Sequence, residues 1–297
     1  MPLTAPRKRI RRVAALTLVI VIGGAAWTFA ERSGQTPSVA AQPVTSPAEL
    51  SRRLPFHPIL YAGPGAGVNT IRAEQQLTVS CMKKHGFTYT PAPITVVDEA
   101  KAGHRAPFGL ESLAPPPEAT EAAPAEVPKS EAFTRALYGD PDDLITAEGK
   151  QLRVSMPANG CQAEAEKQLL GDQRLRRLQL QLQLSDGEQE ARQQLEKDPA
   201  FRTATARWRS CMRAVGFDEK DPVSLLTGLP RDINLTTDRA AYADVRCKDQ
   251  TGYLTTAYTR LGVTQRTWLN RHSDLLADWN RLTHTQDAAA RAVLDPR

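Results

Sequence analysis

The chain has 297 residues, 41% of them hydrophobic, which is enough for one large or two small domains with an ordered core. Aromatic residues make up only 6%, and 22 prolines indicate sizeable stretches without regular structure. The net charge of +5 comes from five basic residues near the start, because removing them from the total of 38 leaves 33 basic against 33 acidic residues. The rest of the chain has no basic excess, and we expect no nucleic-acid partner.

Residues 1–30 predict an anchoring or targeting segment. The basic cluster precedes an uncharged run, Val13–Ala30, whose length as a helix is about 27 Å, close to a hydrocarbon core of about 30 Å. The basic end should stay in the cytoplasm, so everything after residue 31 should lie outside. We favour an uncleaved transmembrane helix in the plasma membrane. The alternative is a signal peptide, cleaved after Ala30 or Ala40, and a secreted protein.

The segment 31–68 predicts a flexible stalk, because six prolines are mixed there with small and polar residues. An extracytoplasmic helical domain should follow over residues 69–297. A second stretch rich in Pro, Ala and Glu, at 91–130, predicts a disordered insertion within that domain.

One short motif occurs twice. Residues 81–87 read Cys-Met-Lys-Lys-His-Gly-Phe, and residues 211–217 read Cys-Met-Arg-Ala-Val-Gly-Phe. Each copy ends a predicted helix, the first over 70–85 and the second beginning near residue 198. Glycine readily takes the left-handed conformation that closes a helix, and the phenylalanine can fold back over the last turn. Backbone geometry therefore explains the Gly-Phe half of the motif without any ligand.

The four cysteines predict two disulfides, because the domain is expected outside the cytoplasm and the number is even. Of the three possible pairings we prefer Cys81–Cys161 with Cys211–Cys247, which gives each repeat its own clasp. The main rival joins Cys81 to Cys211 and Cys161 to Cys247, and would connect equivalent positions of the two repeats.

The remaining pattern predicts a mainly all-α fold, a disulfide-clasped domain of helical hairpins with a long C-terminal helix. Helices are expected at 131–138, 162–170 and 173–197, with one short strand at 151–156. In the last helix, expected from residue 237, apolar residues recur every seven positions, as in a coiled coil, and Gly252 and Gly262 are points where it can break or bend. We interpret this stripe as core, with a partner-facing seam as the alternative. Its residues are Cys247, Leu254, Leu261, Trp268, Leu275 and Leu282.

No catalytic constellation is present in the sequence. Ser80 and Lys83 have the Ser-x-x-Lys spacing, but the Lys-Thr-Gly motif that should accompany it is absent. Cys81 and His85 lie four residues apart and resemble half of a metal site, yet the second repeat has Val215 at the position of His85. We therefore expect no metal and no cofactor.

Aromatic residues of the last helix suggest a weak candidate for a ligand or partner groove. Aromatic side chains at helical spacing are more often core than binding site. The residues are Tyr258, Trp268, His272 and Trp279.

Three segments of the chain resemble a group of uncharacterised secreted or membrane-anchored actinobacterial proteins. They are the tryptophan-associated Cys-Met-x3-Gly-Phe of Trp208–Phe217, the Gly-Cys-x-Ala-Glu-Ala of 160–165 and the Ala-Asp-Val-x-Cys of 243–247. The resemblance covers roughly residues 70–90 and 130–260. It implies an envelope location and a disulfide-bonded helical fold, but no specific reaction.

These observations together predict a non-catalytic binding or scaffolding protein of the bacterial cell envelope, with a role as an accessory of a transporter as one form of this function. Its expected partners are the membrane, through the N-terminal helix, and an envelope protein or a cell-wall component. Two other functions stay open at this stage. One is an envelope enzyme without a recognisable motif, and the other is a carrier of a small ligand or lipid.

Overall fold

The computed structural model describes residues 46–61, 67–94, 106–113, 129–230 and 233–295, which belong to one compact unit that begins at Thr45. The anchor or signal segment predicted at 1–30 lies outside these ranges. Within them, no helix is both long enough and apolar enough to cross a membrane.

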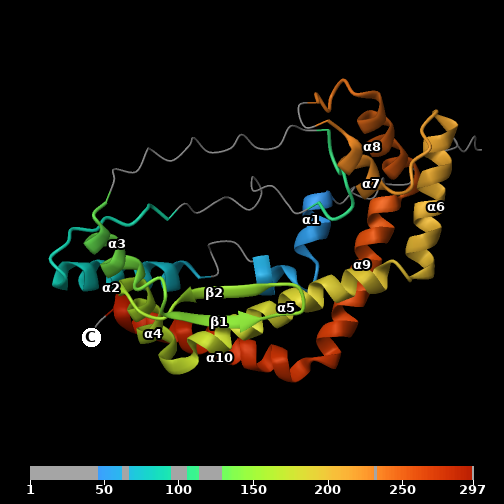
Figure 1. The fold of residues 1–297 in the computed structure, drawn as a ribbon. Helices are drawn as coiled ribbons and strands as arrows, with labels where there is room; N and C mark the ends of the chain where they lie inside the picture. Colours follow the sequence, from blue (N-terminus) through green and yellow to red (C-terminus); the bar gives the residue numbers. More distant parts are fainter. Residues whose placement is uncertain (1–45, 62–66, 95–105, 114–128, 231–232, 296–297) are drawn as a thin grey trace, which may run out of the picture. The chain divides into compact units, whose positions relative to one another are not determined.

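The described part of the chain is mainly helical, as predicted (Figure 1). Besides a π-helical turn at His57–Tyr61 and a 3-10 turn at Gly171–Gln173, the helices are α1 (Pro47–Arg52), α2 (Val68–Lys84), α3 (Glu131–Tyr138), α4 (Cys161–Leu170), α5 (Arg174–Leu195), α6 (Pro199–Ala214), α7 (Pro222–Gly228), α8 (Arg239–Thr251), α9 (Tyr253–Arg271) and α10 (Ser273–Leu294).

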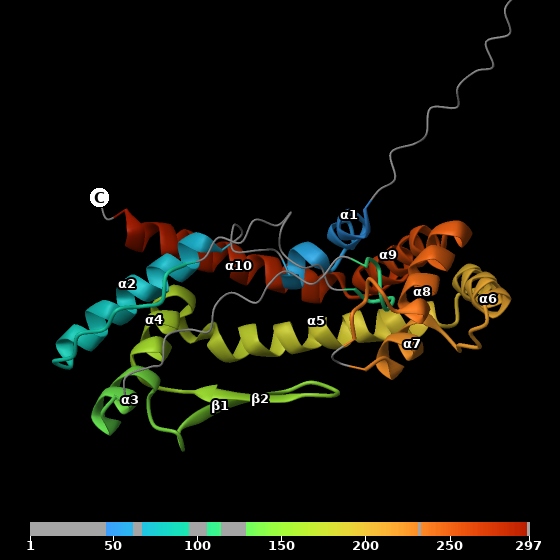
Figure 2. The same ribbon diagram turned by 90° about the horizontal axis from the view of Figure 1, so that it is seen from above.

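Within the described residues, one antiparallel hairpin, β1 (Leu144–Glu148) and β2 (Arg153–Pro157), accompanies these helices. It lies alongside α5, as both views show (Figures 1 and 2). The sequence predicts β2 but not β1, although Ile145 and Thr146 are β-branched residues that favour a strand.

The helices gather around the two disulfides. Near Cys81–Cys161, α2 packs on α3, α4 and α10, and near Cys211–Cys247, α6 packs on α8 and α9. Helix α5 contacts both α9 and α10. The preferred pairing of the four cysteines is therefore confirmed, and the rival pairing is wrong.

Both copies of the repeated motif end their helices in the same way. The N–H of Phe87 donates to the carbonyl of Met82, and the N–H of Phe217 donates to that of Met212, each over 3.0 Å. The preceding glycines, Gly86 and Gly216, have φ of 82° and 94°. This is the Schellman closure, so the structural reading of the motif is confirmed.

The second half of the predicted stalk is part of the folded unit, so the flexible-stalk prediction is wrong for residues 46–61. Pro47 stands in the first turn of α1, where its missing N–H costs no hydrogen bond and its fixed φ suits a helix. Phe56 is fully buried, and its N–H donates to Oε1 of Gln265 on α9 over 3.2 Å. The prediction of a flexible stalk used proline content alone. It failed here because tertiary contacts hold this segment in place.

The predicted disordered insertion at 91–130 also contains an ordered piece, residues 106–113, here named the strap. Phe108 and Leu110 on the strap are buried, and the Glu111 carboxylate accepts hydrogen bonds from the Phe108 N–H and the Tyr258 hydroxyl. The prediction is wrong for the strap, because buried contacts with the C-terminal helices hold it. Residues 95–105 and 114–128 lie outside the described ranges.

The predicted long C-terminal helix is wrong, because the segment folds as α8, α9 and α10. Gly252 ends α8 in the left-handed conformation, with φ 62° and ψ 28°. At His272, ψ turns to 40°, the backbone N–H bonds to the carbonyls of Trp268 and Leu269, and ring Nδ1 lies 2.8 Å from the Trp268 carbonyl. Gly262 does not interrupt α9, in which it is buried against Leu54.

The apolar stripe of the C-terminal segment faces the chain's own core, as interpreted from the sequence. Its members divide between two hydrophobic clusters. The first contains Cys247, Leu254 and Leu261, and the second contains Trp268, Leu275 and Leu282.

Candidate functional site

The four aromatic residues proposed from the sequence do not form one surface. Trp268, His272 and Trp279 lie in or beside the cluster that includes Phe56. Tyr258 belongs to the other cluster, where its ring packs edge-on against Phe108 with 5.0 Å between centroids.

Trp268 and His272 form a stacked pair beside α5. Their ring centroids are 3.9 Å apart, and the planes differ by 16°. The indole Nε1 of Trp268 donates to Oε2 of Glu190 over 3.0 Å. The contact with Lys150, and after it this hydrogen bond from Trp268, hold the pKa of Glu190 below its usual value. The indole N–H of Trp268 has its hydrogen-bond partner within the chain, and its ring packs against His272. These contacts explain why a tryptophan stands here without a ligand.

Trp279 and Tyr258 are core side chains. Trp279 is buried, and the guanidinium of Arg177 lies 3.8 Å from the centroid of its ring, in a cation–π contact. The Tyr258 hydroxyl donates to Oε2 of Glu111 over 2.7 Å, and burial raises the pKa of Tyr258. These contacts agree with the structural interpretation of the aromatic stripe.

A different concave surface lies between α5, α6 and the start of α7, next to the strap. We name it the α6 groove, and its volume is about 1110 Å³, large enough for a sizeable ligand. Its lining includes Phe108 from the strap and Tyr253 and Leu261 from α9. The segments that form it are far apart in sequence, so no single motif marks it.

The floor of the α6 groove is aromatic. The ring of Phe201 lies 6.0 Å from that of Phe108 and 6.1 Å from that of Tyr253, measured between centroids. Tyr253 is almost fully buried, and this burial raises the pKa of its hydroxyl. Phe108 and Tyr253 are buried, so Phe201 is the member of this aromatic group that offers partly exposed apolar surface to a ligand.

The rim of the α6 groove is more basic than acidic. Four basic side chains line it, Arg192, Arg202, Arg209 and Lys220, against the two acidic side chains of Glu196 and Asp221. The carboxylate of Asp221 accepts from the Ser224 N–H over 2.8 Å and so caps α7. Since the rest of the chain after the N-terminal cluster is balanced in charge, this cationic rim is a local feature.

Two of the four cations are held in place by the chain. The guanidinium of Arg209 donates to the carbonyl of Lys220 over 2.7 and 3.2 Å, which ties α6 to the loop before α7. Arg192 lies 3.4 Å from the carboxylate of Glu188, one turn earlier on α5. The side chains of Arg202 and Lys220 belong to exposed residues, which leaves them accessible to an anion.

A buried polar network joins α8 to the strap, which lines part of the groove. Nζ of Lys248 donates to Oδ2 of Asp244 over 2.7 Å and to the carbonyl of Leu110 on the strap, and both charged side chains are almost fully buried. Burial raises the pKa of Asp244 and lowers that of Lys248, while the contact between them opposes both shifts. The network fixes the strap, and with it Phe108, against α8.

The four cysteines predicted from the sequence are all disulfide-bonded. Cys81 joins Cys161 and Cys211 joins Cys247, with Cα–Cα distances of 5.5 and 5.7 Å. The Cys211–Cys247 bond ties α6, which forms one wall of the groove, to α8. The disulfide residues thus have a structural role in positioning the site.

No protein-family model, no curated protein and no solved structure matches the chain.

The sequence contains few signals for the α6 groove. Arg202 and Arg209 are seven residues apart, which places them on one face of a helix, but such spacing is common on solvated faces. Phe108 stands in a segment whose composition predicts disorder. Only the fold brings these residues together.

Proposed function

We propose that this protein is a non-catalytic binding protein of the bacterial cell envelope, anchored in the plasma membrane by residues 1–30, with its helical domain outside. In this proposal the α6 groove binds an anionic ligand that has a flat apolar face. The combination of a cationic rim with an aromatic floor is the single observation that supports it most.

The chemistry of the groove favours an anion. Arg202 and Lys220 can each contact a carboxylate or phosphate, and the fork of an arginine donates two parallel hydrogen bonds to such a group. Next to these cations, the partly exposed ring of Phe201, which packs against the buried Phe108, provides apolar surface on which a sugar ring or an aliphatic segment can pack. A ligand with both properties would use the whole groove.

The ligand class we propose is a carboxylated glycopeptide fragment of the cell wall. Such fragments combine carboxylates with sugar rings, and they would be present where the N-terminal segment is expected to place the domain. The resemblance to secreted and membrane-anchored actinobacterial proteins supports the same location. Within this proposal, a role as an accessory of an envelope transporter would be one use of ligand binding.

Isothermal titration of the purified full-length protein in detergent with soluble muramyl-peptide fragments tests the proposal. We expect saturable binding that weakens with salt, and a loss of at least tenfold in affinity in an R202E/K220E variant. The matched control is R207E/R266E, which reverses two exposed arginines outside the groove, one of them on α6 itself. Equal binding by both variants, or no binding by the wild type, would contradict the proposal.

A further inference from the structure

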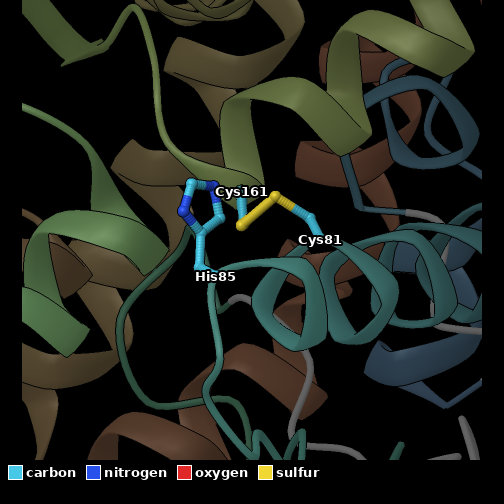
Figure 3. A group of neighbouring side chains, drawn as sticks. All are labelled: Cys81, His85 and Cys161. Carbon is cyan, nitrogen blue, oxygen red and sulfur yellow. A yellow bond between two sulfur atoms is a disulfide. The ribbon is translucent and has the colours of Figure 1, made fainter.

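The side chains of Cys81, His85 and Cys161 converge at the junction of α2 and α4 (Figure 3). Cys81 and His85 come from the end of α2, and Cys161 is the first residue of α4. Their two sulfur atoms and one ring nitrogen all lie within 4.8 Å of one another. In the figure the imidazole stands directly beside the disulfide.

This disulfide differs chemically from the other one. At the position of His85 the second repeat has Val215, which offers no ligand atom. Cys161 stands at the N-terminus of a ten-residue helix, where the helix dipole stabilises a thiolate. Cys211, by contrast, lies near the C-terminal end of α6, where the dipole has the opposite effect.

The carboxylate of Glu164 lies beside the Cys81–Cys161 pair. Oε2 of Glu164, one turn into α4, lies 3.4 Å from Sγ of Cys81. A negative carboxylate next to a cysteine disfavours the thiolate, unless a cation lies between them. Two sulfurs and an imidazole nitrogen are a donor set suited to Zn²⁺, and the negative charge of Glu164 beside them favours a cation there.

We propose that, when the Cys81–Cys161 disulfide is reduced, the two thiolates and the imidazole of His85 bind one Zn²⁺, with a water molecule as the fourth ligand. The ligand atoms of a tetrahedral zinc site are about 3.3–3.8 Å apart, so small side-chain rotations would suffice. In the oxidised protein the bond between the sulfurs closes this site. Metal binding at this junction is thereby controlled by the redox state of one disulfide.

The reaction has a simple balance. A dithiol reductant delivers two electrons and two protons to the disulfide, which becomes two thiols, while the reductant is oxidised to its own disulfide. Binding of Zn²⁺ then displaces the two thiol protons into solvent, and His85 binds as neutral imidazole.

The accessibility of the three ligands fits this sequence of events. Cys161 is fully buried and Cys81 is 7% exposed, whereas His85 is exposed and opens the junction to solvent. A metal ion can therefore approach from the side of His85. The α6 groove contains none of these three residues, so the tests of zinc binding and of the proposed function are independent of each other.

Cobalt titration of the reduced full-length protein tests the zinc proposal. The C211S/C247S variant retains only the first pair, and the C81S/C161S variant retains only the second. Both are reduced with a water-soluble phosphine, desalted without oxygen and titrated with Co²⁺. For the first variant we expect one cobalt per chain, with the thiolate charge-transfer and visible bands of tetrahedral coordination, displaced by one equivalent of Zn²⁺. For the second variant we expect neither.

The role of His85 is tested in the same assay. H85A in the C211S/C247S background should weaken binding at least tenfold, whereas H284A, at an exposed site on α10, should not. Circular dichroism at each step records whether the helices persist. Absence of a tetrahedral spectrum in the first variant, folded or unfolded, would overturn the proposal, and so would equal affinity with and without His85.

Discussion

The indole Nε1 of Trp208 donates a hydrogen bond to Oδ1 of Asp244 over 2.9 Å, and both residues are fully buried. One helical turn further along each helix, Cys211 and Cys247 form the disulfide. Two of the segments singled out in the sequence, Trp208–Phe217 and 243–247, thus meet in space, because both the hydrogen bond and the disulfide join α6 to α8. Their residue spacing has a structural reason, because tryptophan and cysteine on one helix match aspartate and cysteine on the other.

Replacing Asp244 should destabilise the fold strongly. D244N leaves the buried ammonium of Lys248 without its charged partner, and we expect a loss on the order of 3 kcal/mol in the free energy of unfolding. Urea denaturation of the oxidised protein measures it. D249N, at an exposed site on the same helix, should change stability by less than about 0.5 kcal/mol. Similar values for the two variants would show that the buried pair contributes little.

The glycines of the repeated motif should resist substitution for a purely conformational reason. A Cβ at Gly86 or Gly216 would meet no atom within 4 Å, but both residues have positive φ. We expect G86A and G216A each to cost about 1–2 kcal/mol by urea denaturation. Gly228 also has open space around it but no positive φ, so G228A should be neutral or slightly stabilising. A neutral G86A would refute the backbone explanation of the motif.

Glu74 should make stability depend on pH. Burial, with a smaller effect from Glu166, raises its pKa from 4.5 to about 7, against the opposing effects of Gln286 and Arg177. The folded state therefore keeps a proton that the unfolded chain has already lost, so stability falls as pH rises from 4.5 to 7 and then levels off. The difference is at most about 3 kcal/mol.

The E74Q variant checks this pH dependence by urea denaturation at a series of pH values. Its stability should be flatter than that of the wild type between pH 4.5 and 7, and it should exceed the wild type at pH 8. E131Q, at an exposed site on α3, should follow the wild type across the range. An E74Q profile parallel to that of the wild type would show that another group controls the pH dependence.

Gly187 on α5 should be needed for the position of Trp268. An added Cβ would lie 2.4 Å from the indole ring, so the ring must move. Alanine normally favours a helix interior over glycine, but here we expect G187A to destabilise by about 1–3 kcal/mol. Near-UV circular dichroism should change with it, because the indole leaves its place beside Glu190. Q183A, at an exposed site on α5, serves as the control, and an equally stable G187A would contradict the packing.

The helix ends and disulfides were predictable from the sequence because they depend on local chemistry. The left-handed glycines Gly86 and Gly216 and the capping Asp198 act on their own helix, so the residue types alone indicate them. One further cysteine follows each copy of the repeat, and this order was enough to favour the correct disulfide pairing.

The ordered residues 46–61 and the strap were not predictable, because distant residues hold them. Phe56 depends on Gln265, and Phe108 depends on Tyr258 and on the network of Lys248, none of which its own segment reveals. The break at His272 depends on a side chain that bonds to the carbonyl of Trp268. The α6 groove combines such segments, so the sequence does not predict it, for the same reason.

Hydrogen exchange with and without a saturating muramyl-peptide fragment shows directly whether the α6 groove binds this anionic ligand. We expect slower exchange in the strap at 106–113, in α6 and in the first turn of α7, with little change in α2, α4 and α10. Slower exchange around Trp279 instead, or no change anywhere at a concentration that saturates the titration, would contradict the proposal.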